Sequence, residues 1–340
     1  MTILENVELK QFNTFGIDAT AKYFTSLRSD DDIQQLLSTA IFKNEQHLIL
    51  GGGSNVLFTN DFKGLVARVE LTGIDVVGED ADTVALKVGA GENWHGFVRH
   101  CVSQNWGGVE NLSLIPGTVG AAPMQNIGAY GVEIKNIISQ VEAVEIDTRR
   151  TKVFTNVECQ FGYRESIFKQ QAKGKYLISS VTLILTKRNH RLVTGYGALS
   201  ETLGQNANAQ HSIQQISDAV IKIRSSKLPD PSRIGNAGSF FKNPSIHAEL
   251  HDFIKKEHPT LPSYPAENNQ YKIPAAWLIE QCGWKGKTFD NIGIHKHQAL
   301  VLVNYGGGKG HDIWELAMKI QDSVKAKFDI TLQPEVNVIN

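Results

Sequence analysis

Residues 115–131 read Ile115-Pro116-Gly117-Thr118-Val119-Gly120-Ala121-Ala122-Pro123-Met124-Gln125-Asn126-Ile127-Gly128-Ala129-Tyr130-Gly131. The run carries no charge, and glycine and alanine stand where a surface loop usually has polar side chains. Because glycine lacks a Cβ and adopts dihedral angles that other residues avoid, backbone N–H groups can line a concave surface here. The run therefore predicts a loop whose backbone receives an anionic group such as a diphosphate.

A second Gly-rich loop lies upstream. His47–Leu50 has the pattern of a short strand and runs into Gly51-Gly52-Gly53-Ser54-Asn55, which the apolar residues 56–58 follow. Two such loops favour one large phosphate-bearing cofactor, although a tight turn remains the alternative for residues 51–55. Neither loop matches a P-loop or a dinucleotide fingerprint. Residues 306–310 lack the Ser/Thr of a P-loop, so we interpret them as leading into a helix near His311.

Length and charge narrow the class of protein. At 340 residues the chain predicts two or three domains, each with its own core. Lys plus Arg (34) nearly balance Asp plus Glu (35), so the net charge of −1 offers no footprint for nucleic acid or an anionic membrane. The N-terminus has no signal-peptide pattern, and no stretch approaches the ~20 apolar residues of a membrane span. We expect a cytoplasmic protein, with a monomer as the default.

Cysteines and histidines give no sign of a metal site. Cys101, Cys159 and Cys282 are odd in number and far apart, which favours buried free thiols over disulfides or zinc. His295 and His297 could share one side of a strand, but no third ligand stands at a diagnostic spacing. We therefore expect no metal, and interpret these histidines as structural or substrate-facing.

Hydrophobic patterning predicts an α+β fold. Before residue 187 most segments alternate like strands; the clearest are 64–69, 84–88, 141–146 and 176–185. Helical spacing occurs at 31–41 and 92–104, and after residue 187 at 213–224, 246–256, 273–281 and 312–328. The prolines of Lys227–Pro231 favour a domain junction. Residues 332–339 alternate like a strand, and such a C-terminal strand often packs back into an earlier domain.

Three polar residues could carry chemistry. Ser239 stands among small residues and phenylalanines without a G-x-S-x-G elbow, so it is either a proton donor or a turn residue. Arg164 lies among aromatic residues and suits a carboxylate, the alternative being an ion pair with Glu165. Glu335 stands alone on an apolar strand, where desolvation favours its protonated form, or else it is an exposed strand residue. No spacing rule links the three.

Taken together, these segments resemble the UDP-N-acetylenolpyruvoylglucosamine reductase (MurB) family, flavoenzymes of bacterial peptidoglycan precursor synthesis. The resemblance covers essentially the whole chain. It rests on Asn13–Gly16, Gly51–Asn55, Ile115–Gly120, Gln125–Gly131, Phe161–Arg164, Gly238–Pro244 and Pro334–Val336.

The resemblance implies FAD bound noncovalently in a domain of the vanillyl-alcohol-oxidase/p-cresol-methylhydroxylase (PCMH) type, plus a smaller α+β substrate-binding domain. Residues 1–70 and 329–340 would form one FAD-binding lobe, residues 71–228 a second, and residues 229–328 the substrate-binding domain. The implied cofactor-binding residues are Gly51, Gly52, Gly53, Ser54, Asn55, Ser113, Pro116, Gly117, Thr118, Gly120, Ala121, Asn126, Gly128 and Arg164.

The implied reaction is the NADPH-dependent reduction of UDP-N-acetylglucosamine enolpyruvate, a UDP-sugar enolpyruvyl ether, to UDP-N-acetylmuramate. Hydride passes from NADPH to flavin N5 and then to the enolpyruvyl terminal carbon. By the same resemblance Ser239 donates the proton, and Arg164 and Glu335 stabilise charge on the carboxylate side.

Three further positions match substrate-binding residues of the family. Tyr196 corresponds to the substrate-capping tyrosine of the longer type, and Lys227 and Asn243 to residues near the nucleotide diphosphate. Residues 204–210 are longer and more polar than this pattern leads one to expect, which leaves open where the loop that carries Tyr196 is placed.

Two alternatives stay open. The Gly-rich loops identify FAD better than they identify a substrate, so a different flavin oxidase or dehydrogenase on the same cofactor domain is the first. A non-catalytic nucleotide-sugar binding protein, which would need no flavin, is the second.

Overall fold

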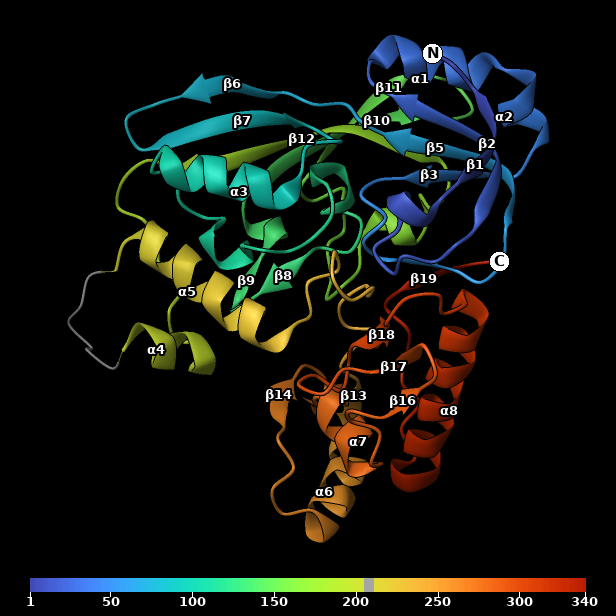
Figure 1. The fold of residues 1–340 in the computed structure, drawn as a ribbon. Helices are drawn as coiled ribbons and strands as arrows, with labels where there is room; N and C mark the ends of the chain where they lie inside the picture. The colour runs from blue at the N-terminus through green and yellow to red at the C-terminus, as the bar shows by residue number, and fades with distance from the viewer. Residues whose placement is uncertain (205–210) are drawn as a thin grey trace. The chain divides into compact units, whose positions relative to one another are not determined.

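The structure, a computed structural model, describes residues 1–204 and 211–340 (Figure 1). The chain forms two compact units, and it passes between them several times. The first unit consists of Met1–Val7, Lys22–Gly52 and Lys63–Ser226. The second unit consists of Glu8–Ala21, Gly53–Phe62 and Lys227–Asn340.

The largest sheet of the first unit is antiparallel, with the strand order β11-β10-β12-β7-β6. Its strands are β6 (Ile74–Glu79), β7 (Thr83–Gly89), β10 (Ile138–Glu145), β11 (Thr151–Thr155) and β12 (Tyr176–Thr186). The strands predicted at 84–88, 141–146 and 176–185 are therefore confirmed.

Alternation along β7 explains how this sheet builds the core. Val84, Leu86 and Val88 are fully buried, and each lies opposite an apolar residue of β12 in the antiparallel register. Helix α3 (Trp94–Ser103) packs its apolar side, which includes Trp94 and Phe97, into the same cluster. It was predicted at 92–104 and is the helix beside β7 and β12 in Figure 1.

A second sheet has the order β1-β2-β5-β3, and its neighbouring strands β3 and β5 are parallel. Its strands are β1 (Leu4–Glu8), β2 (Thr20–Leu27), β3 (His47–Leu50) and β5 (Phe62–Val69). The predictions at 47–50 and 64–69 are thus confirmed.

The prediction of a single helix at residues 31–41 is wrong in one respect. Two helices occupy the region, α1 (Asp30–Ser38) and α2 (Ala40–Asn44), with an extended Thr39 between them. The Thr39 hydroxyl accepts a hydrogen bond from the N–H of Phe42 (3.1 Å), which starts a new helix. Apolar spacing continues through the break, so it did not reveal this cap.

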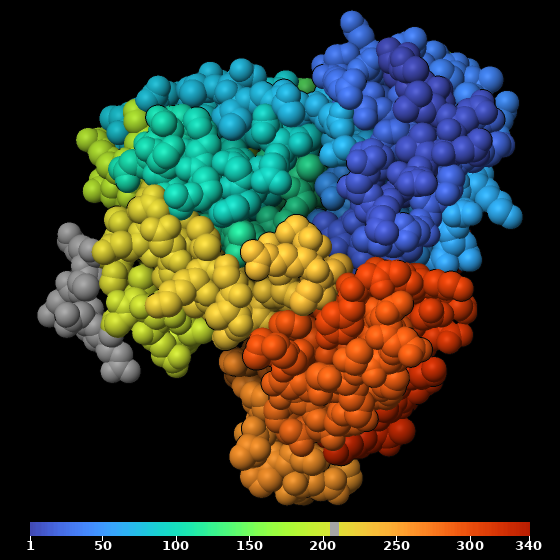
Figure 2. All heavy atoms as spheres, viewed as in Figure 1, coloured from blue at the N-terminus to red at the C-terminus, as the bar shows by residue number. Residues whose placement is uncertain are grey.

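The rest of the first unit lies around the Gly/Ala-rich run. It contains a hairpin of β8 (Gly128–Ala129) and β9 (Val132–Glu133), and the helices α4 (Gly197–Leu203) and α5 (Ile213–Lys227). α5 was predicted at 213–224; it is yellow in Figure 2, where it forms part of the visible surface.

The second unit contains small sheets and three longer helices. The strands are β4 (Val56–Phe58), β13 (Ser245–His247), β14 (Tyr264–Ala266), β15 (Gln270–Lys272), β16 (Thr288–Phe289), β17 (Ile292–Ile294), β18 (Leu302–Asn304) and β19 (Asn337–Ile339). The helices are α6 (Ala248–Glu257), α7 (Ala275–Gln281) and α8 (Gly310–Phe328). The glycines at 306–310 lead into α8, as predicted.

The helices predicted at 273–281 and 312–328 are confirmed as α7 and α8, each beginning within two residues of the predicted start. Two other predictions in this unit differ from the structure. Residues 245–247 form β13, which pairs with β15, so the helix predicted at 246–256 begins later, at Ala248. The C-terminal strand is β19 alone, paired in parallel with β4. Pro334, which has no N–H to donate, makes only an isolated bridge with Phe241. Mostly antiparallel sheets with helices beside them confirm the α+β class.

Candidate active site

The two Gly-rich loops of the first unit touch through their backbones. A Cβ on Gly52 would lie 2.9 Å from the Cα of Gly117, and a Cβ on Gly51 would lie 2.7 Å from the Thr118 hydroxyl oxygen. Carbon atoms normally stay about 3.5 Å or more apart. The approach therefore depends on glycine at both positions, which the sequence could suggest but not establish.

Backbone hydrogen bonds hold the longer loop in place. The N–H of Trp94 donates to the carbonyl of Gly117 (3.0 Å), and the N–H of Gly120 donates to the carbonyl of Ala90 (2.9 Å). A Cβ on Gly120 would overlap the side chain of Ala90. The loop is thus docked onto the segment between β7 and α3.

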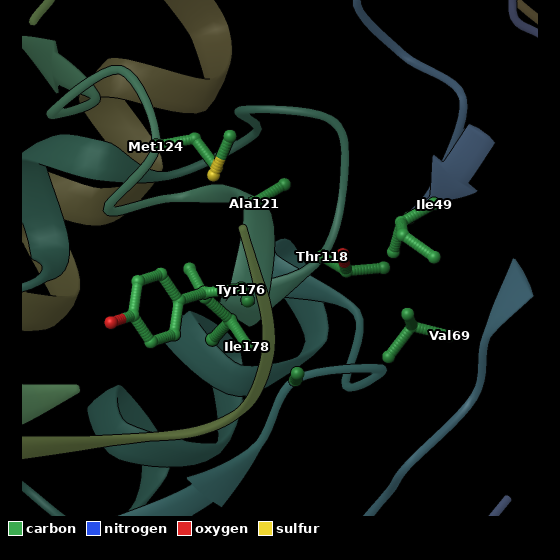
Figure 3. A pocket seen from close by; sticks show the side chains of 10 residues that line it. Ile49, Val69, Thr118, Ala121, Met124, Tyr176 and Ile178 are labelled. Carbon is green, nitrogen blue, oxygen red and sulfur yellow. The ribbon is translucent and has the colours of Figure 1, made fainter. Parts of the chain in front are cut away.

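A pocket of about 500 Å³, counting the space open to solvent, lies at this meeting point (Figure 3). Its lining residues are Ile49, Gly51, Val69, Ala90, Thr118, Gly120, Ala121, Met124, Tyr176 and Ile178. Figure 3 shows Ile49 and Val69 across from Tyr176 and Ile178. Gly51, Thr118, Gly120 and Ala121 were among the predicted cofactor residues. The strand residues in the lining were missed, because nothing local distinguishes them from other apolar strand positions.

Other predicted cofactor residues of the first unit lie outside this lining. Pro116 is exposed, whereas Ser113 is fully buried, with its hydroxyl 2.8 Å from that of Ser217. The buried Asn126 donates to the carbonyl of Gly162 (2.9 Å) and accepts from the N–H of Lys135 (3.1 Å). Its amide is therefore held from both ends.

Arg164 is brought together with the Gly128 region. Its guanidinium donates to the carbonyl of Gly128 (2.7 Å) and lies 5.3 Å from the ring centroid of Tyr163. Its φ of +57° is in the left-handed region, which a bulky residue rarely adopts. Such a conformation persists only where the surroundings impose it, and it is typical of functional sites.

Gly53, Ser54 and Asn55 belong to the second unit. Gly53 has a φ of +62°, and a Cβ there would overlap the carbonyl of Phe12, so only glycine fits. The Asn55 amide donates to the carbonyl of Glu335 (3.1 Å). The end of this loop is thereby tied to the segment that carries a predicted catalytic residue.

The second unit also brings Ser239 and Glu335 close along the backbone. The N–H of Glu335 donates to the carbonyl of Phe240 (2.8 Å), next to Ser239. Phe240 is fully buried and anchors this pairing, whereas the Ser239 side chain is exposed. Two candidates far apart in the sequence thus lie on adjoining segments. Arg164 belongs to the first unit.

The predicted substrate residues occupy three different elements. Tyr196 precedes α4, is exposed, and packs edge-on against Tyr130 with 5.6 Å between ring centroids. Lys227 is the exposed last residue of α5. The Asn243 side-chain oxygen accepts from the N–H of Ala275 (2.9 Å), at the start of α7. Of residues 204–210, residues 205–210 lie outside the described part of the chain.

The described residues contain no cluster of three His, Cys, Asp or Glu side chains that could hold a metal ion. Burial raises the pKa of Cys101 well above its usual range and that of Cys159 to about 12, so both are thiols at neutral pH. No helix within residues 1–204 and 211–340 is long and apolar enough to cross a membrane.

Known proteins match both parts of the chain. Residues 230–339 match the family described as UDP-N-acetylenolpyruvoylglucosamine reductase, C-terminal domain, and residues 21–155 match an FAD binding domain. A UDP-N-acetylenolpyruvoylglucosamine reductase from Amoebophilus asiaticus is 49% identical over 339 residues, covering 100% of both chains. The chain belongs to the UDP-N-acetylenolpyruvoylglucosamine reductase family.

Further relatives agree with this membership. A reductase of the same name from Flavobacterium johnsoniae is 48% identical over 339 residues, again covering 100% of both chains. The crystal structure of UDP-N-acetylenolpyruvylglucosamine reductase from Thermus caldophilus has a TM-score of 0.71 at 22% identity, with 100% of both chains covered, and shows the same fold. The resemblance drawn from the motifs is confirmed, and a non-catalytic binding protein is excluded.

The chain is thus a flavin-dependent reductase with FAD as its cofactor and a PCMH-type FAD-binding domain. The pocket of the first unit fits this group. Ile49, Val69 and Ile178 offer apolar walls, and Gly51 and Thr118 bring the two Gly-rich loops into the lining. Apolar walls suit aromatic rings and exposed backbone suits a diphosphate; which residue holds which part of FAD stays a prediction.

Proposed function

We propose that this reductase converts UDP-N-acetylglucosamine enolpyruvate to UDP-N-acetylmuramate with NADPH as the hydride donor. The full-length similarity to reductases of that name carries the proposal. The pocket between the Gly-rich loops supports it, because a flavin enzyme needs one cradle for a large phosphate-bearing cofactor.

When bound, FAD would supply the hydride-transfer chemistry, from NADPH to the terminal carbon of the enolpyruvyl group. The protein must then supply a proton to the adjacent carbon and stabilise negative charge that develops toward the carboxylate. We assign the proton to the hydroxyl of Ser239. Exposure of this hydroxyl, beside the anchored Phe240, supports that role because a proton donor must reach the substrate.

We assign to Arg164 and Glu335 the stabilisation of the negative charge that develops toward the substrate carboxylate. A guanidinium presents a rigid fork that matches a carboxylate. The hydrogen bond from Arg164 to Gly128 and its left-handed backbone hold this fork in one orientation before substrate arrives, and preorganised donors are the ones that lower a barrier. The backbone of Glu335 is held by Asn55 and Phe240.

Substrate binding is assigned to Tyr196, Lys227 and Asn243. The ring of Tyr196 is exposed and can therefore reach a ligand, and the ammonium of Lys227 suits a diphosphate. Because the side-chain oxygen of Asn243 already accepts from Ala275, its N–H₂ group is the part that would contact phosphate oxygens.

The domain roles follow the same scheme. Residues 1–70 and 329–340 are proposed as one FAD-binding lobe, which the pairing of β19 with β4 supports. Residues 71–228, which contain the five-stranded sheet, form the second lobe, and residues 229–328 bind substrate. We also propose that the enzyme is cytoplasmic, with a monomer as the default.

Separate half-reactions test the assignment of Ser239. In Ser239→Ala, anaerobic NADPH should bleach the flavin at the wild-type rate, whereas reoxidation by UDP-N-acetylglucosamine enolpyruvate should slow by about 10²–10⁴, the usual cost of losing a general acid. Ser38→Ala, at the exposed end of α1, is the control and should change neither rate. Equal slowing of both half-reactions by Ser239→Ala would contradict the role.

A further inference from the structure

Asn111 is a buried side chain that bridges two segments. It lies in the short 3-10 helix Glu110–Leu112 and is fully buried. Its Nδ2 donates to the backbone carbonyls of Tyr130 (3.0 Å) and Val193 (2.8 Å), so both amide hydrogens are used. Its Oδ1 is buried with no partner among the residues that the structure describes. The two donations therefore set the orientation of the amide.

The two carbonyls belong to segments with different predicted roles. Tyr130 lies near the end of the Gly/Ala-rich run that lines the cofactor pocket. Val193 lies in residues 190–195, which have no regular secondary structure and lead directly to Tyr196. The rings of Tyr130 and Tyr196 meet at 81° with 5.6 Å between centroids. One buried amide thus ties the segment before the capping tyrosine to the end of the cofactor loop.

Tyr130 is itself fixed, so Val193 is the partner that the bridge restrains. The Tyr130 backbone is left-handed, with a φ of +49°, and its side chain lies near the guanidinium of Arg224 on α5. A non-glycine residue in this region holds its conformation only when its surroundings impose it. In contrast, residues 190–195 depend on individual contacts such as the one to Asn111.

We propose that Asn111 is a positioning residue of this reductase, which couples the cofactor loop to the Tyr196 segment and so sets where Tyr196 meets the substrate. The proposal rests on the proposed function, because it uses the substrate role of Tyr196. Asn111 acts through Tyr196, since its own side chain is fully buried.

Asn111→Leu is the direct test. Leucine keeps the branched shape of the asparagine side chain, although its methyl groups are larger, and it makes neither donation. Because Oδ1 has no partner among the described residues, no accepted hydrogen bond is lost. Asn156→Leu is a matched control in the same unit: the Asn156 amide also donates to two backbone carbonyls, those of Lys135 (2.7 Å) and Ile138 (2.8 Å), but these segments do not lead to Tyr196.

Steady-state and transient kinetics give the first readout. Asn111→Leu should raise the KM for UDP-N-acetylglucosamine enolpyruvate by about 5- to 150-fold, as expected for two lost hydrogen bonds. Its kcat and the rate of flavin reduction by NADPH should stay near wild type, and Asn156→Leu should leave KM unchanged. In a Tyr196→Ala background, Asn111→Leu should have no further effect on KM. Additive effects of the two substitutions would overturn the coupling.

Amide hydrogen exchange separates the bridge from the proposed function. Exchange in residues 190–196 should become faster in Asn111→Leu and not in Asn156→Leu; unchanged exchange would overturn the bridge. If exchange becomes faster but Tyr196→Ala alone leaves KM unchanged, the proposed substrate role of Tyr196 has failed and the coupling falls with it. Should Asn111→Leu not fold, Asn111→Ser, whose short hydroxyl cannot bridge both carbonyls, takes its place.

Discussion

Gly52→Ala should weaken FAD binding without unfolding the protein. The added Cβ would lie 2.9 Å from the Cα of Gly117, and ordinary contacts begin at 3.4 Å, so the loops must separate by at least 0.5 Å (3.4 − 2.9). The neighbour is backbone and cannot rotate away. Gly52 does not have a positive φ, so alanine adds no dihedral strain and the effect is one of space alone.

The size of the effect follows from overpacking. Forcing an extra methyl group into a well-packed site costs about 1–3 kcal/mol. In the apoprotein the loops can move apart to relieve this contact, whereas FAD bound as we propose requires both loops on its surface, so we expect most of the cost to fall on binding. We therefore expect the Kd for FAD to rise about 5- to 150-fold.

Titration of apoprotein with FAD, followed by quenching of flavin fluorescence, measures this change. Gly78→Ala on β6 is the matched control, because its Cβ would lie 3.6 Å from the Cβ of Ala85, an ordinary contact. Its Kd should equal that of wild type. If Gly52→Ala is folded and binds FAD as tightly as Gly78→Ala, the close approach of the two loops does not shape the cofactor site.

Two other predictions concern stability. Burial and two nearby arginines lower the pKa of His95 from 6.5, which keeps its Nδ1 free to accept from the N–H of Leu114 (2.9 Å). Because the His95 imidazole is protonated more readily in the unfolded chain, the stability that neutral His95 contributes is complete above pH 6.5 and is lost as the pH falls through the pKa of the folded state. Urea unfolding at pH 7.5 and at pH 5.5 should therefore show a larger decrease in the free energy of unfolding for wild type than for His95→Gln. The buried Asn304 amide accepts from the N–H groups of Gly306 and Gly308 and donates to two backbone carbonyls. Asn304→Ala should therefore lower the free energy of unfolding by about 2–4 kcal/mol. The exposed Asn337→Ala is its control, and equal losses would contradict the argument.

Local patterns in the sequence predicted much of the fold. The alternation of β7 and the helical spacing of α3 are visible within a few residues, because each element must bury one side. The break at Thr39 was not predictable from spacing, since it depends on a side-chain cap rather than on the apolar pattern. β13 was missed for a similar reason: three residues become a strand only where β15 lies beside them.

The site divides in the same way. The Gly-rich loops and the isolated Ser239 and Glu335 stand out in the sequence, because a chain without Cβ atoms, or a lone polar residue among apolar ones, is unusual wherever it occurs. Nothing in the sequence distinguishes Tyr176 and Ile178 as pocket walls, or Asn111 as a bridge between two segments.

The sequence by itself determined which segments can approach a cofactor closely and which side chains can transfer a proton. Only the tertiary structure decided that Gly52 meets Gly117 and that Glu335 pairs beside Ser239. The hydrophobic periodicity of a segment indicates only which side of that one element is buried. These long-range contacts instead require long loops of chain to close, which costs conformational entropy. Burial of the whole hydrophobic core offsets that cost. A short segment of sequence therefore cannot predict these contacts, because the entropy and burial terms depend on the whole chain.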